Sequence, residues 1–119
     1  PEGDLLHLVS TSRVLPRGWP NPILTGADGV RLPTPDLWFD DVALAVQVHS
    51  RRYHGSPADW DDTVAADGVY AEHGVPVVAV TPHLIAVEAD ATLRRIEAAH
   101  RAASAKPRPT VVARPFGMG

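Results

Sequence analysis

Apolar residues at helical spacing predict a helix near each end of the chain. The first has Leu5, Leu6 and Val9 on one side and ends before Pro16. The second follows Asp90, which is suited to cap its N-terminus. One face of this second helix is formed by Leu93, Ile96, His100 and Ala103.

Residues 42–49 alternate strictly and predict a central strand. One side of this strand is bulky and apolar, formed by Val42, Leu44, Val46 and Val48. The other side is small and then polar, formed by Ala43, Ala45, Gln47 and His49. This pattern is typical of a strand that is buried on both faces. The two polar side chains, Gln47 and His49, both lie at the C-terminal end of this strand. Polar groups that are buried there require hydrogen-bond partners.

Turn-forming residues delimit the other strands. The pair Asp28-Gly29 predicts a hairpin turn between strands at 21–24 and 30–32, and residues 37–39 continue the second of these strands.

The centre of the chain is predicted to contain a helix, a strand and a short helical segment. The helix opens at Pro57, runs to His73 and ends at Gly74. The apolar run at 77–81 predicts a buried strand, and the short helical segment begins at Pro82.

The order of elements is therefore helix, three antiparallel strands, helix, strand and helix. This order predicts an α/β fold, a three-layer α/β/α sandwich with a small mixed sheet. We assign residues 1–103 to this single domain. Residues 104–119 contain three prolines and are predicted to be a tail or linker.

The composition of the 119-residue chain limits its chemistry. Cysteine is absent, which excludes disulfides, thiolate zinc sites and cysteine nucleophiles. No apolar run is long enough to span a membrane and no secretion signal is present, so we expect a cytoplasmic protein without a membrane partner. Because the chain starts at Pro1, we expect it to be a piece of a longer protein with a domain upstream.

The formal charge of −3 is unfavourable for a freestanding DNA-binding module, because clustered basic residues supply most non-specific affinity. Ten of the eleven basic residues are arginines, however. The adjacent pairs Arg51-Arg52 and Arg94-Arg95 predict a local basic rim on an otherwise acidic body.

Three polar residues are predicted to meet at one end of the sheet. Asp36 follows Pro35 at the end of one strand, and Gln47 and His49 end the neighbouring strand. Mg²⁺ takes oxygen ligands, usually from one or two carboxylates together with water and phosphate. These residues are therefore candidates for a metal-assisted site.

The same residues carry a resemblance to a known family. Pro35-Asp36, the segment VALAVQVHSRRYH, and the helix start SPADWDDT before VPVVAVTP are similar to the restriction-endonuclease-like (PD-(D/E)XK) superfamily. Within it, the chain resembles the branch of very-short-patch repair endonucleases and related actinobacterial domains of unknown role. The similarity covers approximately residues 2 to 100.

The repair-endonuclease branch implies a specific set of site residues. Its first aspartate and a backbone carbonyl hold the metal, which assigns Mg²⁺ or Mn²⁺ to Asp36 and the Val48 carbonyl. Two histidines orient or deprotonate the attacking water, and the matching residues are His49 and His54. The resemblance assigns Glu2 to a metal-bound water.

The resemblance also implies DNA as a partner, with Arg51, Arg52 and Tyr53 against it. The chain departs from the common form of the superfamily at Gln47 and His49, where that form has Glu and Lys. Gln47 stays among the candidate catalytic residues because it occupies the glutamate position. An amide there removes one full negative charge from a cation site.

Three functions are open at this point. The first is a divalent-metal-dependent DNA endonuclease. The second is a catalytically degenerate nuclease fold that serves as a DNA-binding, antitoxin-like or regulatory module of a larger protein with an upstream winged-helix domain. The third is a homodimerising structural domain without a nucleic-acid role, which the negative charge permits.

Each candidate residue also has a structural explanation. Asp36 is suited to end a strand and cap a turn. Gln47 and His49 are explained equally well as core polar groups bonded to the backbone. Trp19, Trp38 and Trp60 are expected to pack in the core or at a strand edge rather than to stack on bases.

Overall fold

The computed structural model describes residues 2–49 and 57–115, except for the side chains of residue 2 and residues 57–63. The elements in chain order are α1 (Glu2–Ser10), β1 (Trp19–Pro20), β2 (Ile23–Gly26), β3 (Leu37–Phe39), β4 (Leu44–Val48), α2 (Pro57–Glu72), β5 (Val77–Val80), α3 (Pro82–Val87), α4 (Ala89–Ser104) and β6 (Val111–Arg114). None of the described helices is long and apolar enough to cross a membrane.

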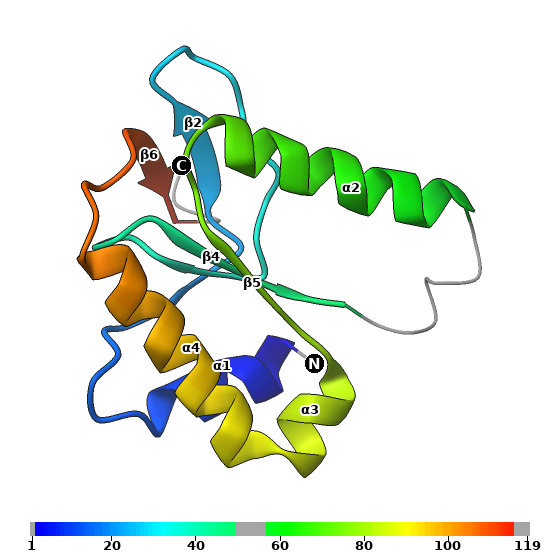
Figure 1. Cartoon of the computed structure of the whole chain (residues 1–119), viewed down its shortest axis with the longest axis vertical. Helices are drawn as coiled ribbons and strands as arrows, with labels where there is room; N and C mark the ends of the chain where they lie inside the picture. Colours follow the sequence, from blue (N-terminus) through cyan, green and yellow to red (C-terminus); the bar gives the residue numbers. More distant parts are fainter. Residues whose placement is uncertain (1, 50–56, 116–119) are drawn as a thin grey trace.

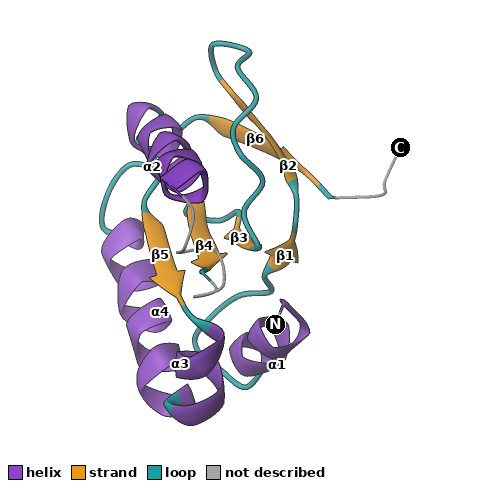
Figure 2. Cartoon of the chain, turned by 90° about the vertical axis from the view of Figure 1, so that its right-hand side faces the viewer, coloured by secondary structure: helices purple, strands orange, loops and turns teal. Residues whose placement is uncertain are grey.

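Four strands form the central sheet in the order β1-β3-β4-β5 (Figure 2). The first two pairings are antiparallel, and β4 pairs with β5 in parallel. A parallel pair needs a crossover connection, and α2 lies in the connection between β4 and β5. The predicted mixed α/β organisation with a small mixed sheet is therefore confirmed.

Both faces of this sheet are covered, as Figure 1 shows. Helices α1, α3 and α4 pack on one face, and α2 with the β2–β6 pair lies on the other. The alternation of β4 decides which side chains enter which core. Leu44 and Val46 pack against the three helices, whereas Ala45 packs under α2 and the β2–β6 pair. The strand itself is shorter than predicted, because Ala43 adopts a positive φ of 58° in the turn before it.

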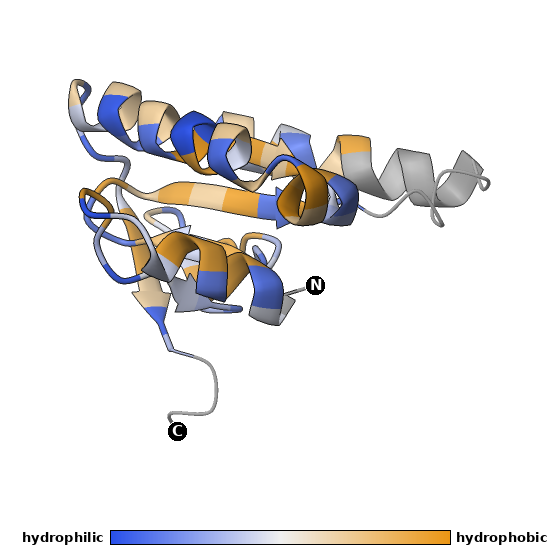
Figure 3. Ribbon diagram, turned by 90° about the horizontal axis from the view of Figure 1, so that it is seen from below, coloured by the Kyte–Doolittle hydropathy of each residue, from blue (hydrophilic) through white to orange (hydrophobic). Residues whose placement is uncertain are grey.

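Apolar burial accounts for this arrangement. The largest buried side chains are Trp38, Tyr70 and Phe39, which are all wholly buried. In Figure 3 the central strand is apolar along most of its length, whereas the helices around it also carry polar turns. Burial of such side chains contributes roughly 1.5 to 3 kcal/mol each.

The predicted hairpin is only partly present. The turn at Gly29 forms with a φ of 82°, and the chain pairs back through an isolated bridge between Thr25 and Arg31. However, β2 is not a strand of the central sheet. The first strand of that sheet is β1, which was not predicted because two residues give no periodic signal.

The strand β2 pairs instead with β6, which belongs to the segment predicted as a tail or linker. Val111 of β6 is buried and Val112 is 65% exposed, so this short strand has one core face and one solvent face. A strand of four residues is too short for the sequence to reveal that alternation.

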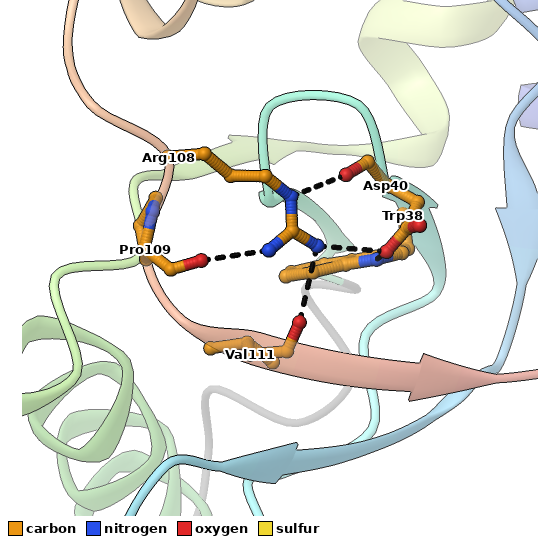
Figure 4. A network of polar contacts seen from close by, with 5 residues as sticks. All are labelled: Trp38, Asp40, Arg108, Pro109 and Val111. Carbon is orange, nitrogen blue, oxygen red and sulfur yellow. Dashed lines mark hydrogen bonds and ion pairs between the residues drawn. The ribbon is translucent and has the colours of Figure 1, made fainter.

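A network around Arg108 fixes this last segment to the turn between β3 and β4 (Figure 4). The guanidinium donates to the Asp40 carbonyl oxygen at 2.7 Å, to Asp40 Oδ1 at 2.9 Å and to the Val111 carbonyl oxygen at 3.1 Å. Asp40 Oδ1 also accepts from the indole N–H of the buried Trp38 at 3.0 Å. One carboxylate therefore joins the core to the C-terminal strand.

The helix boundaries follow local signals. Thr81 caps α3 by accepting from the Leu84 N–H at 3.1 Å, with Pro82 in the first turn. Gly74 follows α2 with a φ of 73°, which favours glycine. Asp90 is not the cap that the sequence predicts. It lies in the first turn of α4, where a carboxylate is favourable near the helix N-terminus.

Candidate functional site at the end of β4

The structure brings Asp36 to the end of β4. Because β3 and β4 run antiparallel, the start of β3 lies beside the last residues of β4. Asp36 Oδ2 accepts from the Val48 backbone N–H at 2.6 Å. The carboxylate thus continues the hydrogen bonding of the sheet beyond the last paired residue of β3. The metal-binding roles of Asp36 and the Val48 carbonyl stay predictions.

Gln47 belongs to a second chain of hydrogen bonds on the α2 side of the sheet. Its Nε2 donates to the Tyr70 hydroxyl at 3.1 Å, and that hydroxyl donates to the Pro33 carbonyl oxygen at 2.6 Å. A phenol has a single proton, and here it is directed at Pro33. The hydroxyl oxygen must therefore accept from position 47, which requires a donor there. The amide of Gln47 supplies that donor, whereas a carboxylate would not.

Burial raises the pKa of the Tyr70 hydroxyl above its ordinary value, and the nearby carboxylates of Asp36 and Asp67 raise this pKa further. The hydrogen bond from Gln47 acts in the opposite direction. Tyr70 consequently keeps its proton, and its bond to Pro33 persists throughout the physiological pH range. Sequence reasoning missed Tyr70 and Asp67. The only signal for Tyr70 was that a buried Gln47 requires a partner.

His49 lies directly after β4, where its backbone N–H donates to the Val80 carbonyl oxygen at 2.8 Å. Its side chain is half-buried and has no hydrogen bond to any residue of the described part of the chain. The imidazole is therefore placed at the same strand end as Asp36 without being fixed by a partner.

Several predicted site residues fall outside the described residues. These are Arg51, Arg52, Tyr53 and His54, which follow β4 in the sequence. Glu2 begins α1, but its side chain is not described. Their assigned roles in metal, water and DNA binding stay predictions.

The described donor set fits a strong Mg²⁺ site poorly. Within residues 2–49 and 57–115, no group of three or more His, Cys, Asp or Glu gathers where it would hold a metal ion. The end of β4 offers the Asp36 carboxylate and neutral oxygens, and one Asp36 oxygen already accepts from Val48. Mg²⁺ is bound in proteins through one or two carboxylates and substrate phosphates. A cation here would therefore depend largely on phosphate and water.

Two histidines outside this site have structural partners. His73 Nδ1 lies 2.9 Å from the Val69 carbonyl oxygen and His73 Nε2 lies 3.0 Å from Asp28 Oδ2. Both ring nitrogens face acceptors, so the hydrogen bond to Val69 and then that to Asp28 raise the pKa of His73. His100 Nε2 lies 2.7 Å from Asp41 Oδ2, and its ring packs edge-on against Phe39.

Comparison of the chain with protein-family models, with curated proteins and with solved structures gives no match.

Proposed function

We propose that the chain is a nuclease-like domain with a restriction-endonuclease-like fold. The direction of pairing in the central sheet supports this, with two antiparallel pairs followed by a parallel one and helices on both faces. The position of Asp36 against the end of β4 supports it further, because strand ends that converge are where such a fold carries its polar residues.

We further propose that this domain binds DNA as a regulatory module and does not hydrolyse it. The observation that carries this proposal is the hydrogen-bond chain from Gln47 through Tyr70 to Pro33. Gln47 stands where the superfamily has its second carboxylate. Its amide is held by the Tyr70 hydroxyl as a structural partner. A site built around the amide retains too little negative charge to bind Mg²⁺ well.

A second function, the divalent-metal-dependent DNA endonuclease, is favoured by a different observation. The Asp36 carboxylate lies at the backbone of Val48, and the side chain of His49 has no hydrogen bond to any residue of the described part of the chain. When bound, Mg²⁺ or Mn²⁺ at Asp36 and the Val48 carbonyl would polarise the phosphodiester. In this second function, His49 would act as the general base that accepts a proton from the attacking water.

One experiment distinguishes the two functions. Purified protein is incubated with supercoiled plasmid in Mg²⁺, Mn²⁺ or EDTA, and binding of a labelled duplex is measured by fluorescence anisotropy in parallel. We expect DNA binding without cleavage. Metal-dependent cleavage that Asp36→Ala abolishes and the neighbouring Asp67→Ala leaves intact would establish the endonuclease instead. Absence of DNA binding would refute both and favour the structural function.

A further inference from the structure

The loop after α1 is fixed against one side of α4. Ser12 Oγ donates to Glu97 Oε2 at 2.6 Å. The same oxygen accepts from the backbone N–H groups of Val14 and Leu15 at 3.2 and 3.1 Å, and Leu15 packs against the core. In Figure 1 this loop runs beside α4 in the lower part of the molecule. The loop and this side of α4 therefore form one surface.

Four arginines lie on or beside this surface. Arg94 and Arg101 are three residues before and four residues after Glu97, so they share its side of α4. Arg13 directly follows Ser12, and Arg17 lines a groove of about 460 Å³ together with Ser12. All four are exposed, and none has a hydrogen bond or ion pair to any residue in the described ranges. We call Arg13, Arg17, Arg94 and Arg101 the arginine face.

The acidic residues near the arginine face are few. Glu97 is bonded to Ser12, and Asp90 lies one turn before Arg94 on the same side of α4. Asp41 is paired with His100, which directly precedes Arg101 on α4. The opposite face of the sheet is covered by α2, whose sequence contains five acidic residues and no basic one. A polyanion is therefore repelled from α2 and attracted to the arginine face, although the chain has a net charge of −3.

We infer that the arginine face binds the phosphate backbone of DNA. Guanidinium groups bind phosphate in a bidentate geometry, and here they have no competing intramolecular partner within the described residues. Arg94 and Arg101 are separated by about 10 Å along the helix axis, which corresponds to about three nucleotide steps of one strand. This inference rests on the proposed DNA-binding function and adds a contact surface distinct from the end of β4.

The test compares two triple variants with the same loss of charge. The first is Arg13→Gln, Arg94→Gln and Arg101→Gln in the arginine face. The control is Arg31→Gln, Arg95→Gln and Arg114→Gln, which removes three exposed arginines elsewhere. Arg95 is on α4, about 100° around the helix from Arg94. Thermal melting checks that both variants stay folded.

Affinity for a labelled 30-base-pair duplex is measured by anisotropy from 50 to 300 mM NaCl. We expect the arginine-face variant to lose about tenfold or more in affinity near 100 mM salt, with a salt slope lower by about 2 to 3. The control should change much less. Equal losses in both variants, or no loss in the arginine-face variant while the wild type binds, would overturn this inference alone.

Other outcomes are also decisive. If the wild type does not bind DNA, the proposed function fails together with this inference. Binding of anionic lipid vesicles that depends on the arginine face, without DNA binding, would assign this surface to a membrane and overturn the inference as well.

Discussion

Replacing Tyr70 with phenylalanine tests the hydrogen-bond chain at the end of β4. The substitution keeps the buried ring and removes only the hydroxyl, which donates to Pro33 at 2.6 Å and accepts from Gln47 at 3.1 Å. Each bond contributes about 1 kcal/mol net. Pro33 and Gln47 are both half-buried, so water will satisfy them in part after the change. We therefore expect Tyr70→Phe to lower the free energy of unfolding by about 1.5 to 3 kcal/mol.

A double-mutant cycle separates the two bonds. Gln47→Met removes only the bond from position 47 and keeps the length of the side chain, so its cost should be about 0.5 to 1.5 kcal/mol. The coupling between the two substitutions should be about 1 kcal/mol, since residues in contact share that bond. Urea denaturation followed by circular dichroism measures all four proteins. A loss under 0.5 kcal/mol for Tyr70→Phe, or a coupling near zero, would refute the role of the Tyr70 hydroxyl.

Four further predictions concern stability elsewhere in the fold. Arg108→Ala should lower the free energy of unfolding by about 1 to 2 kcal/mol and accelerate amide hydrogen exchange in β6. The control Arg114→Ala should change the free energy of unfolding by no more than about 0.5 kcal/mol. Equal exchange rates in the two variants would contradict the network of Figure 4. Gly26→Ala should destabilise by about 1 to 3 kcal/mol, because its Cβ would lie 2.6 Å from His73 Cδ2. Gly68→Ala should stabilise by about 0.5 to 1 kcal/mol, because nothing lies within 4 Å of its Cβ position, and thermal melting compares both glycine variants. The pKa of His73 is raised, and the pKa of Asp28 is lowered, first by the hydrogen bond from the Val30 N–H. The pair should therefore stabilise the fold between about pH 4 and about pH 6.5. This stabilisation is lost at acid pH as Asp28 protonates and at higher pH as His73 loses its proton, so a constant difference in melting temperature between wild type and His73→Gln from pH 5 to 9 would contradict the pair.

Local sequence determined the elements whose signals lie within a few residues. The alternation of β4 placed its side chains correctly on the two faces of the sheet, because period-two patterning decides burial directly. The start of α3 after Thr81 and the end of α2 before Gly74 were likewise set by capping and by a positive φ. The mixed character of the sheet followed from the order of these elements, although its first strand, β1, was not predicted and β2 lies outside it.

Only the tertiary structure decided which distant segments meet. The bond from Gln47 reaches Tyr70 across 23 residues, and the bond from Tyr70 reaches Pro33 across 37. Arg108 and Asp40 are 68 residues apart. No spacing rule predicts such partners, because they depend on which polar groups and strand edges stay uncovered after the two cores have formed. For the same reason, the sequence by itself indicated polar groups at the end of β4, whereas packing against α2 decided that Gln47 is held as a hydrogen-bond donor.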